Sequence, residues 1–304
     1  MWNLVIWDGK TKDFIDVKCP NFRIKDIIQF NYLHEQYYII ILTNQEKKCL
    51  LSNYDGGDFV IITCDLDTSS SQSDCPVAVN PHIHGVIYAN IKKTSQQAIT
   101  YISTDDGITF EPIKLINFKG QDVGGLKLTI PCSIINSMNF PMPWISVFDG
   151  VYNLSRDHQI ISIDGGLNWR LTPLYNFRPT VLNDGGIIFG VDPHTEAFVF
   201  SYDSDSWYNV KIHPDDDIMI VVPNGHPSTK FVNVISKNTV PGMLKLTNLD
   251  FLTVLNRTCQ DDDFESWSMP RPHSYCCDRQ NISYLRIKNN SFCAADRAKI
   301  IEQA

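Results

Sequence analysis

Two histidines and two runs of aspartate are the residues whose chemistry would suit a metal ion. His82 and His84 stand two residues apart, so both side chains would lie on one face of a strand, as a pair of zinc ligands can. No third ligand follows at a usable spacing. Residues 215–217 and 261–263 are all aspartate, but no 12-residue acidic loop of the EF-hand kind accompanies them. We therefore expect solvated turns, with no metal and no cofactor.

A second chemical pattern is the Asp-box, Ser/Thr-x-Asp-x-Gly-x-x-Trp/Phe, which occurs twice. Its Ser and Asp side chains can bond the amides of a tight turn, its Gly can take a positive φ, and its aromatic ring packs under the hairpin. The matching residues are Ser103, Asp105, Gly107 and Phe110 in one box and Ser162, Asp164, Gly166 and Trp169 in the other. Such a turn can bind a ligand, but a structural element repeated once per sheet is the better interpretation.

Two weaker versions of the box extend the repeat. Residues 52–59 keep the Ser, the Gly and the final Phe59, with Tyr54 in place of Asp, and residues 201–207 are one residue short and lack the Gly. The final aromatics Phe59, Phe110, Trp169 and Trp207 are 51, 59 and 38 residues apart. Spacings of about 40 to 60 residues suit the four-stranded blades of a β-propeller.

The elements that would position these turns are short strands. Runs of four to seven residues rich in Ile, Val, Tyr and Phe alternate with Gly, Asp, Asn and Pro, which predicts an all-β fold. About four or five blades fit before residue 255, and a helix is expected only at residues 294–303. An open propeller would expose sheet edges, so we expect the rest of the ring as a partner.

Composition narrows the class of partner. The 304 residues are 43% hydrophobic and carry a formal net charge of −8, with no block of Lys and Arg. This argues against nucleic acid and against an anionic membrane surface. The longest apolar run, residues 37–42, is too short to cross a bilayer.

Features of secretion conflict with the start of the chain. No basic region or cleavage site follows Met1, so no signal peptide is expected. Yet nine cysteines are present, and four Asn-x-Ser/Thr sequons are candidates for N-glycosylation: Asn153, Asn256, Asn281 and Asn289. We therefore expect a stretch of a longer secreted or membrane-anchored protein.

The cysteines suggest one loop closure and one small module. Cys64 and Cys75 flank a polar loop of ten residues, which a disulfide would stabilise by about 2–3 kcal/mol, the alternative being two unpaired thiols. Four further cysteines lie within 35 residues: Cys259, Cys276, Cys277 and Cys293. So short a segment cannot build its own core, which predicts a disulfide module. We place the domain boundary at residue 258, with the propeller part at 1–258 and the module at 259–304.

Several of these motifs together resemble the sortilin family of vacuolar-protein-sorting receptors, over nearly the whole chain. The residues that carry the resemblance are the loop from Cys64 to Cys75 followed by His82-Ile83-His84, the stretch Asn183-Asp184-Gly185-Gly186-Ile187-Ile188, and Cys259, Asp263, Phe264, Trp267, Cys276, Tyr284-Leu285-Arg286-Ile287-Lys288 and Cys293. A single Asp-box is shared with sialidases and other propellers, whereas the combination is specific.

The resemblance implies a ten-bladed propeller, of which the carboxyl part is present, followed by a truncated cysteine-rich module. It would pair Cys64 with Cys75 and Cys259 with Cys293, and would send Cys276 to a cysteine beyond residue 304. Cys277 doubles the family's single cysteine and makes that choice uncertain. The family pattern assigns no partner to the other three cysteines, Cys19, Cys49 and Cys132.

For function, the resemblance implies binding of peptide, propeptide or protein cargo and its sorting between Golgi, endosome and cell surface. The expected location is the lumenal or extracellular side, with membrane attachment only through a segment outside this chain. The family's best-known ligand-anchoring positions fall in the earlier half of the ring, so no ligand-binding residue is carried over.

Two alternatives stay open. A sialidase-like glycosidase would need arginines converging on a substrate carboxylate and an acidic pair or a Tyr nucleophile. Phe22-Arg23-Ile24 resembles the first sialidase arginine motif, but Lys25 replaces the expected Pro and no further members are recognisable, so we name no catalytic residue. The other alternative is a truncated soluble protein that acts as a scaffold or decoy.

Overall fold

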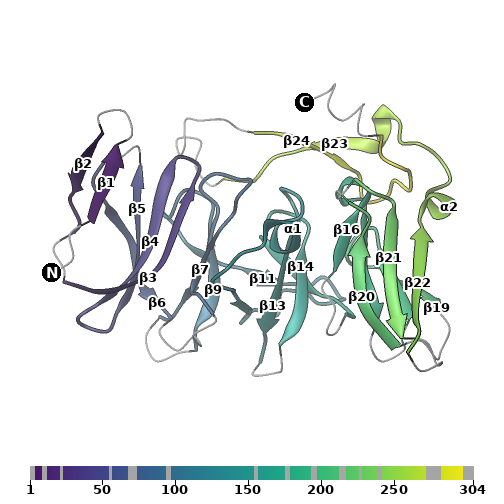
Figure 1. Cartoon of the computed structure of the whole chain (residues 1–304), viewed down its shortest axis with the longest axis horizontal. Coiled ribbons are helices and arrows are strands. Elements are labelled where there is room, and N and C mark those ends of the chain that lie inside the picture. The colour runs from purple at the N-terminus through teal and green to yellow at the C-terminus, as the bar shows by residue number, and fades with distance from the viewer. Residues whose placement is uncertain are drawn as a thin grey trace. The chain divides into compact units, whose positions relative to one another are not determined.

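The computed structural model of the chain is built almost entirely from β-strands (Figure 1). It describes residues 4–8, 12–20, 23–54, 57–67, 74–93, 97–153, 157–174, 179–192, 197–211, 217–225, 228–237, 242–271 and 282–296. Within them, α-helix is limited to α1 (Asn136–Asn139) and α2 (Leu252–Leu255), with 3-10 turns η1 (Asn183–Gly185) and η2 (Asp261–Asp263). The all-β prediction is confirmed, while most of the helix expected at 294–303 lies outside the described residues.

The chain divides into two compact units, which we describe separately. Unit 1 comprises residues 1–113, 125–134 and 271–279, and unit 2 comprises residues 114–124, 135–270 and 280–304.

Unit 1 contains a hairpin and one eight-stranded sheet, which consists of two antiparallel four-stranded meanders joined where β6 pairs with β8. A four-stranded meander is the form of a propeller blade. The hairpin is β1 (Leu4–Asp8) and β2 (Asp13–Val17). The first meander is β3 (Ile24–Leu33), β4 (Gln36–Thr43), β5 (Lys48–Tyr54) and β6 (Val60–Leu66). The second is β7 (Val77–Val79), β8 (Ile87–Ile91), β9 (Ile99–Ser103) and β10 (Glu111–Pro112). Strand β12 (Lys127–Thr129) also belongs to this unit.

The central strand β4 shows why this unit has two cores. Successive side chains of a strand point to opposite faces. Tyr38 and Ile40 enter one hydrophobic cluster, and Ile39 and Ile41 enter another on the opposite face. All four are at most 2% exposed. The uninterrupted apolar run at residues 37–42 therefore reflects a sheet that is covered on both faces.

Unit 2 continues the same architecture. One sheet contains β11 (Lys114–Leu115), β13 (Ser146–Val151), β14 (His158–Ser162) and β15 (Asn168–Leu171). The next contains β16 (Thr180–Leu182), β17 (Ile187–Asp192), β18 (Ala197–Ser201) and β19 (Tyr208–Lys211). The third contains β20 (Asp217–Pro223), β21 (Phe231–Lys237) and β22 (Leu244–Asp250). Strands β23 (Phe264–Trp267) and β24 (Tyr284–Ile287) form a separate two-stranded sheet. Both lie in residues 259–304, which we call the cysteine-rich segment.

Disulfides in unit 1 join segments that are neighbours in space. Cys49 of β5 bonds Cys64 of β6, with a Cα–Cα distance of 4.0 Å. Cys75 bonds Cys132, and the Cys75 amide donates to the carbonyl of Ile130. The predicted link between Cys64 and Cys75 is therefore wrong. Closeness along the chain suggested it, but sheet pairing and the adjacent 130–132 segment supply closer partners.

The remaining cysteines fall into three groups. Cys259 bonds Cys293, as expected. Cys276 and Cys277 lie outside the described residues. Cys19 is unpaired in the part of the chain that the structure describes, and burial raises the pKa of its thiol.

Non-reducing peptide mapping tests this pattern. Protein produced in the secretory pathway is expected to yield linked peptides for Cys49–Cys64, Cys75–Cys132 and Cys259–Cys293, with Cys19 open to alkylation under denaturing conditions. A peptide linking Cys64 to Cys75 would contradict the pairing.

Candidate functional site

The second Asp-box turn, between β14 and β15, uses its own side chains to satisfy its own amides. The hydroxyl of Ser162 donates to Asp164 Oδ1 (2.8 Å) and accepts from the amide of Gly166 (2.9 Å). Asp164 Oδ1 also accepts from the amide of Asn168 (3.0 Å). Trp169 is fully buried, and its Nε1 donates to the carbonyl of Gly166 (2.8 Å). The acidic side chain is therefore engaged within the turn.

The first box, after β9, repeats this geometry. Ser103 donates to Asp105 Oδ1 (2.8 Å) and accepts from the amide of Gly107 (2.8 Å), while the amide of Thr109 donates to the same carboxylate oxygen (2.9 Å). Gly107 has φ +87°, and a Cβ there would stand 2.4 Å from Cγ2 of Ile62. Glycine is thus required both by the backbone and by the space available.

The shortened box at residues 201–207 forms its turn with one residue fewer than the complete boxes. Asp203 accepts from the hydroxyl of Ser201 (3.1 Å) and from the amide of Ser206 (2.7 Å). Each complete box has two consecutive residues with positive φ, whereas here Ser204 alone takes a positive φ, of 62°. The deletion therefore removes the position that glycine fills in the complete boxes. In the weakest box, Ser52 and Phe59 are buried, but residues 55–56 lie outside the described chain.

These bonds set the charge state of the turn carboxylates. Burial by itself raises the pKa of Asp105, but hydrogen bonds from Thr109, Ser103 and the backbone outweigh it, so the pKa lies below its usual value of 3.8. Asp203 follows the same balance, with burial opposed by bonds from the turn at Ser206 and Asp205. Both groups are carboxylates at neutral pH and serve as fixed acceptors.

In unit 1, a downstream arginine binds the first box. Arg271 donates from Nη1 to the carbonyl oxygen of Thr104 (2.8 Å) and from Nη2 to that of His84 (2.7 Å). Thr104 is the second residue of the box. The guanidinium therefore joins the box turn to the neighbouring loop of the same unit.

In unit 2, Arg286 of β24 makes the equivalent contact. Its Nη1 donates to the carbonyl of Ile163 (3.0 Å), the second residue of the second box, and its Nε donates to Glu265 (2.7 Å). Gly165 in this turn also lies against Trp267 and Met269, since a Cβ there would stand 2.6 Å from the Met269 sulfur. The cysteine-rich segment thus docks on the box itself.

An aromatic contact replaces the arginine at the short box. The ring of Phe292 meets the ring of Tyr202, again the second box residue, at 4.5 Å in an edge-on arrangement. Sequence reasoning missed all three contacts. Arg286 lies in a stretch already singled out, but neither its partner nor that of Arg271 has a signal in the sequence.

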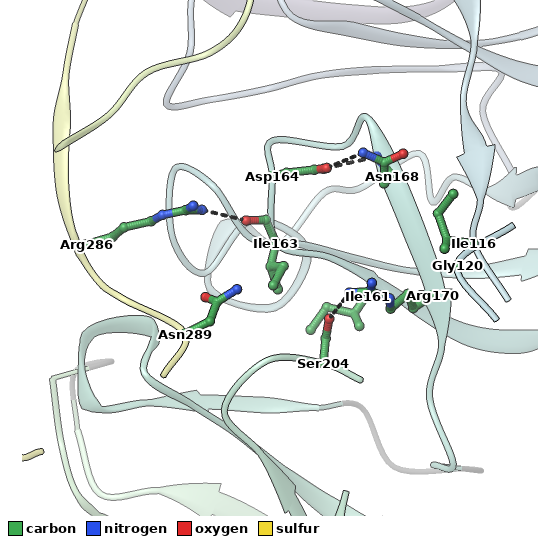
Figure 2. Close-up of a pocket in the computed structure, with 10 residues that line it drawn as sticks. All are labelled: Ile116, Gly120, Ile161, Ile163, Asp164, Asn168, Arg170, Ser204, Arg286 and Asn289. Carbon is green, nitrogen blue, oxygen red and sulfur yellow. Dashed lines mark hydrogen bonds between the residues drawn. The ribbon is translucent and has the colours of Figure 1, made fainter. Parts of the chain in front are cut away.

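A pocket of about 400 Å³ lies beside the second box in unit 2 (Figure 2). We call it the box-2 pocket. It is lined by a mixture of aliphatic, amide, hydroxyl and charged groups: Ile116, Gly120, Ile161, Ile163, Asp164, Asn168, Arg170, Ser204, Arg286 and Asn289. Figure 2 shows Arg286 directed at the Ile163 carbonyl on one side of the pocket and Arg170 beside Ser204 on another.

The described residues contain one cluster of three candidate metal ligands, Cys259, Asp263 and Cys293. The two cysteines are bonded to each other, and Asp263 accepts from both Nη atoms of Arg257 (2.6 and 2.7 Å). The arginine holds the pKa of the Asp263 carboxyl far below its usual range. These groups are engaged in bonds of their own and do not suit a metal.

The other sequence candidates are placed as follows. The ring of His84 meets that of His34 edge-on at 5.4 Å. The sequon residues Asn153, Asn256 and Asn289 are exposed, whereas Asn281 lies outside the described residues. Their glycosylation stays a prediction.

Replacing Asp105 with Asn tests the role of the box carboxylate. Because the folded pKa is lowered, its contribution to stability is present above the unfolded pKa and is lost as pH falls through the folded value. Wild type is expected to exceed Asp105→Asn in denaturant midpoint at pH 7, and the gap should narrow below about pH 4. Asp58→Asn, at an exposed carboxylate, is the matched control. An unchanged gap from pH 7 to pH 3 would count against the carboxylate role.

Replacing Arg271 tests the docking contact. Arg271→Gln is expected to cost about 1.5–3 kcal/mol, the range for hydrogen bonds to charged groups. Arg271→Lys should cost less, because an ammonium keeps the charge but lacks the planar fork that reaches two carbonyls. Hydrogen exchange of amides 103–110 measures the effect locally, and equal exchange in all three proteins would contradict it.

Comparisons with known proteins agree with the motifs. A family model described as "Sortilin, neurotensin receptor 3, C-terminal" matches residues 223–303. Vacuolar protein sorting/targeting protein PEP1 of Saccharomyces cerevisiae (strain RM11-1a) is 27% identical over 232 residues, which cover 66% of this chain and 14% of that protein. Vacuolar protein sorting/targeting protein 10 of Aspergillus flavus is 25% identical over 210 residues, covering 64% of this chain and 14% of that protein. The chain thus spans about one seventh of these relatives' length.

Solved structures show only distant similarity. A putative TolB from Agrobacterium tumefaciens aligns over 82% of this chain and 84% of its own, with 11% identity and a TM-score of 0.30. A Trypanosoma rangeli sialidase aligns over 76% of this chain and 45% of its own, with 11% identity and a TM-score of 0.28.

In the part of the chain that the structure describes, no helix is long and apolar enough to cross a membrane. The family-model match, residues 223–303, includes β21, β22 and the segment that the Cys259–Cys293 bond closes. By these matches, the chain is similar to the sortilin and vacuolar-protein-sorting receptor family, and the family model supports this for residues 223–303.

Proposed function

We propose that the chain is a ligand-binding part of a sorting receptor, taking up peptide, propeptide or protein cargo for transport between Golgi and endosomes. The observation that carries the proposal is the match to curated vacuolar sorting proteins over 66% of the chain. Its setting would be the lumenal side of Golgi and endosome and the cell exterior. The module would begin at residue 259, after a propeller part at 1–258.

An uncovered sheet face in unit 2 supports a further part of the proposal, that more blades complete the ring. One face of sheet β20–β22 enters a buried cluster through Val232 and Val234. The opposite face carries Ile220, Leu244 and Leu246, which are 47%, 65% and 69% exposed. A sheet that is apolar on both faces needs a layer on each. The partner would be the N-terminal part of the propeller.

The cysteine-rich segment supports a receptor more than an enzyme. A sialidase-type site needs several free arginines that converge on a substrate carboxylate, whereas Arg271 is bound to two backbone carbonyls and Arg286 to a backbone carbonyl and Glu265. We therefore propose no catalysis. The truncated soluble decoy is the second alternative, and it would bind cargo without delivering it.

A chimeric receptor tests the function. This chain would replace the homologous segment of the yeast PEP1 protein in cells lacking that protein. We expect a vacuolar reporter protein to be retained in the cell rather than secreted.

The matched controls are the unmodified yeast receptor and a chimera carrying Cys259→Ser and Cys293→Ser. A correctly folded chimera that reaches the Golgi but secretes as much reporter as the receptor-free strain would contradict the proposal. Binding of the reporter without its delivery would favour the decoy.

A further inference from the structure

The box-2 pocket contains one guanidinium whose hydrogen bonds are not satisfied. Arg170 donates from Nη1 to Ser204 Oγ at 3.4 Å, and its Nε lies 3.6 Å from Asp205 Oδ1. That Nε is buried and finds no hydrogen-bond acceptor among the described residues. A guanidinium has five N–H donors, and leaving a buried one unmade is costly. The arginine is therefore held ready for a further acceptor.

The other charged groups of the pocket are already engaged. Arg286 is bonded to Glu265 and to the Ile163 carbonyl, and Asp164 is bonded within the box and to the side chain of Asn168. The rival for Arg170 is Asp205, whose side chain is 53% exposed. An exposed ion pair at this separation contributes little, so an incoming anion can displace it.

The rest of the lining restricts the ligand further. Ser204 and Asn289 offer a hydroxyl and an amide, while Ile116, Ile161 and Ile163 supply aliphatic surface. A volume of about 400 Å³ is at the small end of ligand sites. A carboxylate on a short methylene chain matches both the guanidinium fork and this aliphatic surface.

We propose that the box-2 pocket binds an acidic side chain of a peptide ligand, with glutamate the best fit and Arg170 as its anchor. This site rests on the proposed cargo-binding function, since such peptides would be cargo. Binding would pair the carboxylate with Arg170, release Asp205 to solvent and place the methylene groups against the isoleucines.

Two small probes test the site directly. N-acetyl-glutamate α-amide carries one side-chain carboxylate, and N-acetyl-glutamine α-amide has the same shape without the charge. Their binding to the full chain is measured by ligand-observed NMR, with inorganic phosphate as a third probe. Protein from an oxidising bacterial periplasm keeps the sequon at Asn289 free of glycan.

The variants are expected to act in opposite directions. Arg170→Gln should weaken binding of the glutamate probe about tenfold or more, the loss of a charge-assisted pair. Asp205→Asn should strengthen it by removing the rival carboxylate, and this variant keeps the test valid should Arg170→Gln fold poorly. Arg23→Gln, at an exposed arginine of unit 1, should change nothing.

Three results would overturn the site. In the first, the glutamine probe binds as tightly as the glutamate probe. In the second, Asp205→Asn binds the glutamate probe no more tightly than the wild type does. In the third, phosphate binds more tightly than the glutamate probe. In the yeast chimera, Arg170→Gln separates the site from the receptor function. Sorting that persists after the pocket has lost its ligand would overturn the cargo role of the pocket and leave the receptor proposal intact.

Discussion

The constraint on which this structure depends is that its sheets are apolar on both faces. Strand β4 sends Tyr38 and Ile40 into one core and Ile39 and Ile41 into another. In unit 2, Phe189 of β17 faces the cluster shared with β20–β22, while Gly190 lies against Leu174 on the other side. A sheet of this kind needs a layer against each apolar face, and in a propeller the neighbouring blades supply it. The repetition of blade-like meanders follows directly.

Such packing is possible only if the turns between neighbouring strands are short and have a fixed geometry, and the Asp-box provides turns of this kind. A slip of one residue in register would move every core side chain to the wrong face. Ser162 and Asp164 fix the turn through bonds to its amides, and Trp169 fills the space beneath it. The short box reaches the same end with a single left-handed residue, Ser204. The pattern is thus tolerant in sequence and strict in geometry.

The sequence could predict those features that are local. The apolar run 37–42 and the Ser-x-Asp-x-Gly turns indicated the strands and boxes, because both rest on residues close together in the chain. Strand β3 has no clear strand pattern in the sequence, since Lys25, Asp26 and Gln29 interrupt its apolar residues. The Cys64 partner was missed for a related reason, because Cys49 is adjacent only once β5 and β6 pair. Arg170 and the box-2 pocket depend on segments distant in sequence and had no local signal.

The way the boxes are satisfied also explains what docks on them. Their side chains are acceptors, and they consume the amide donors of the turn. The carbonyl of the second box residue is not used within the turn, and a carbonyl away from water needs a hydrogen-bond donor. A guanidinium is donor-only and can reach two acceptors at once, as Arg271 does with Thr104 and His84. Arg286 meets the same carbonyl position at Ile163. The turn of each complete Asp-box therefore leaves a free backbone carbonyl, at Thr104 or Ile163, to which an arginine from the segment after residue 258 donates.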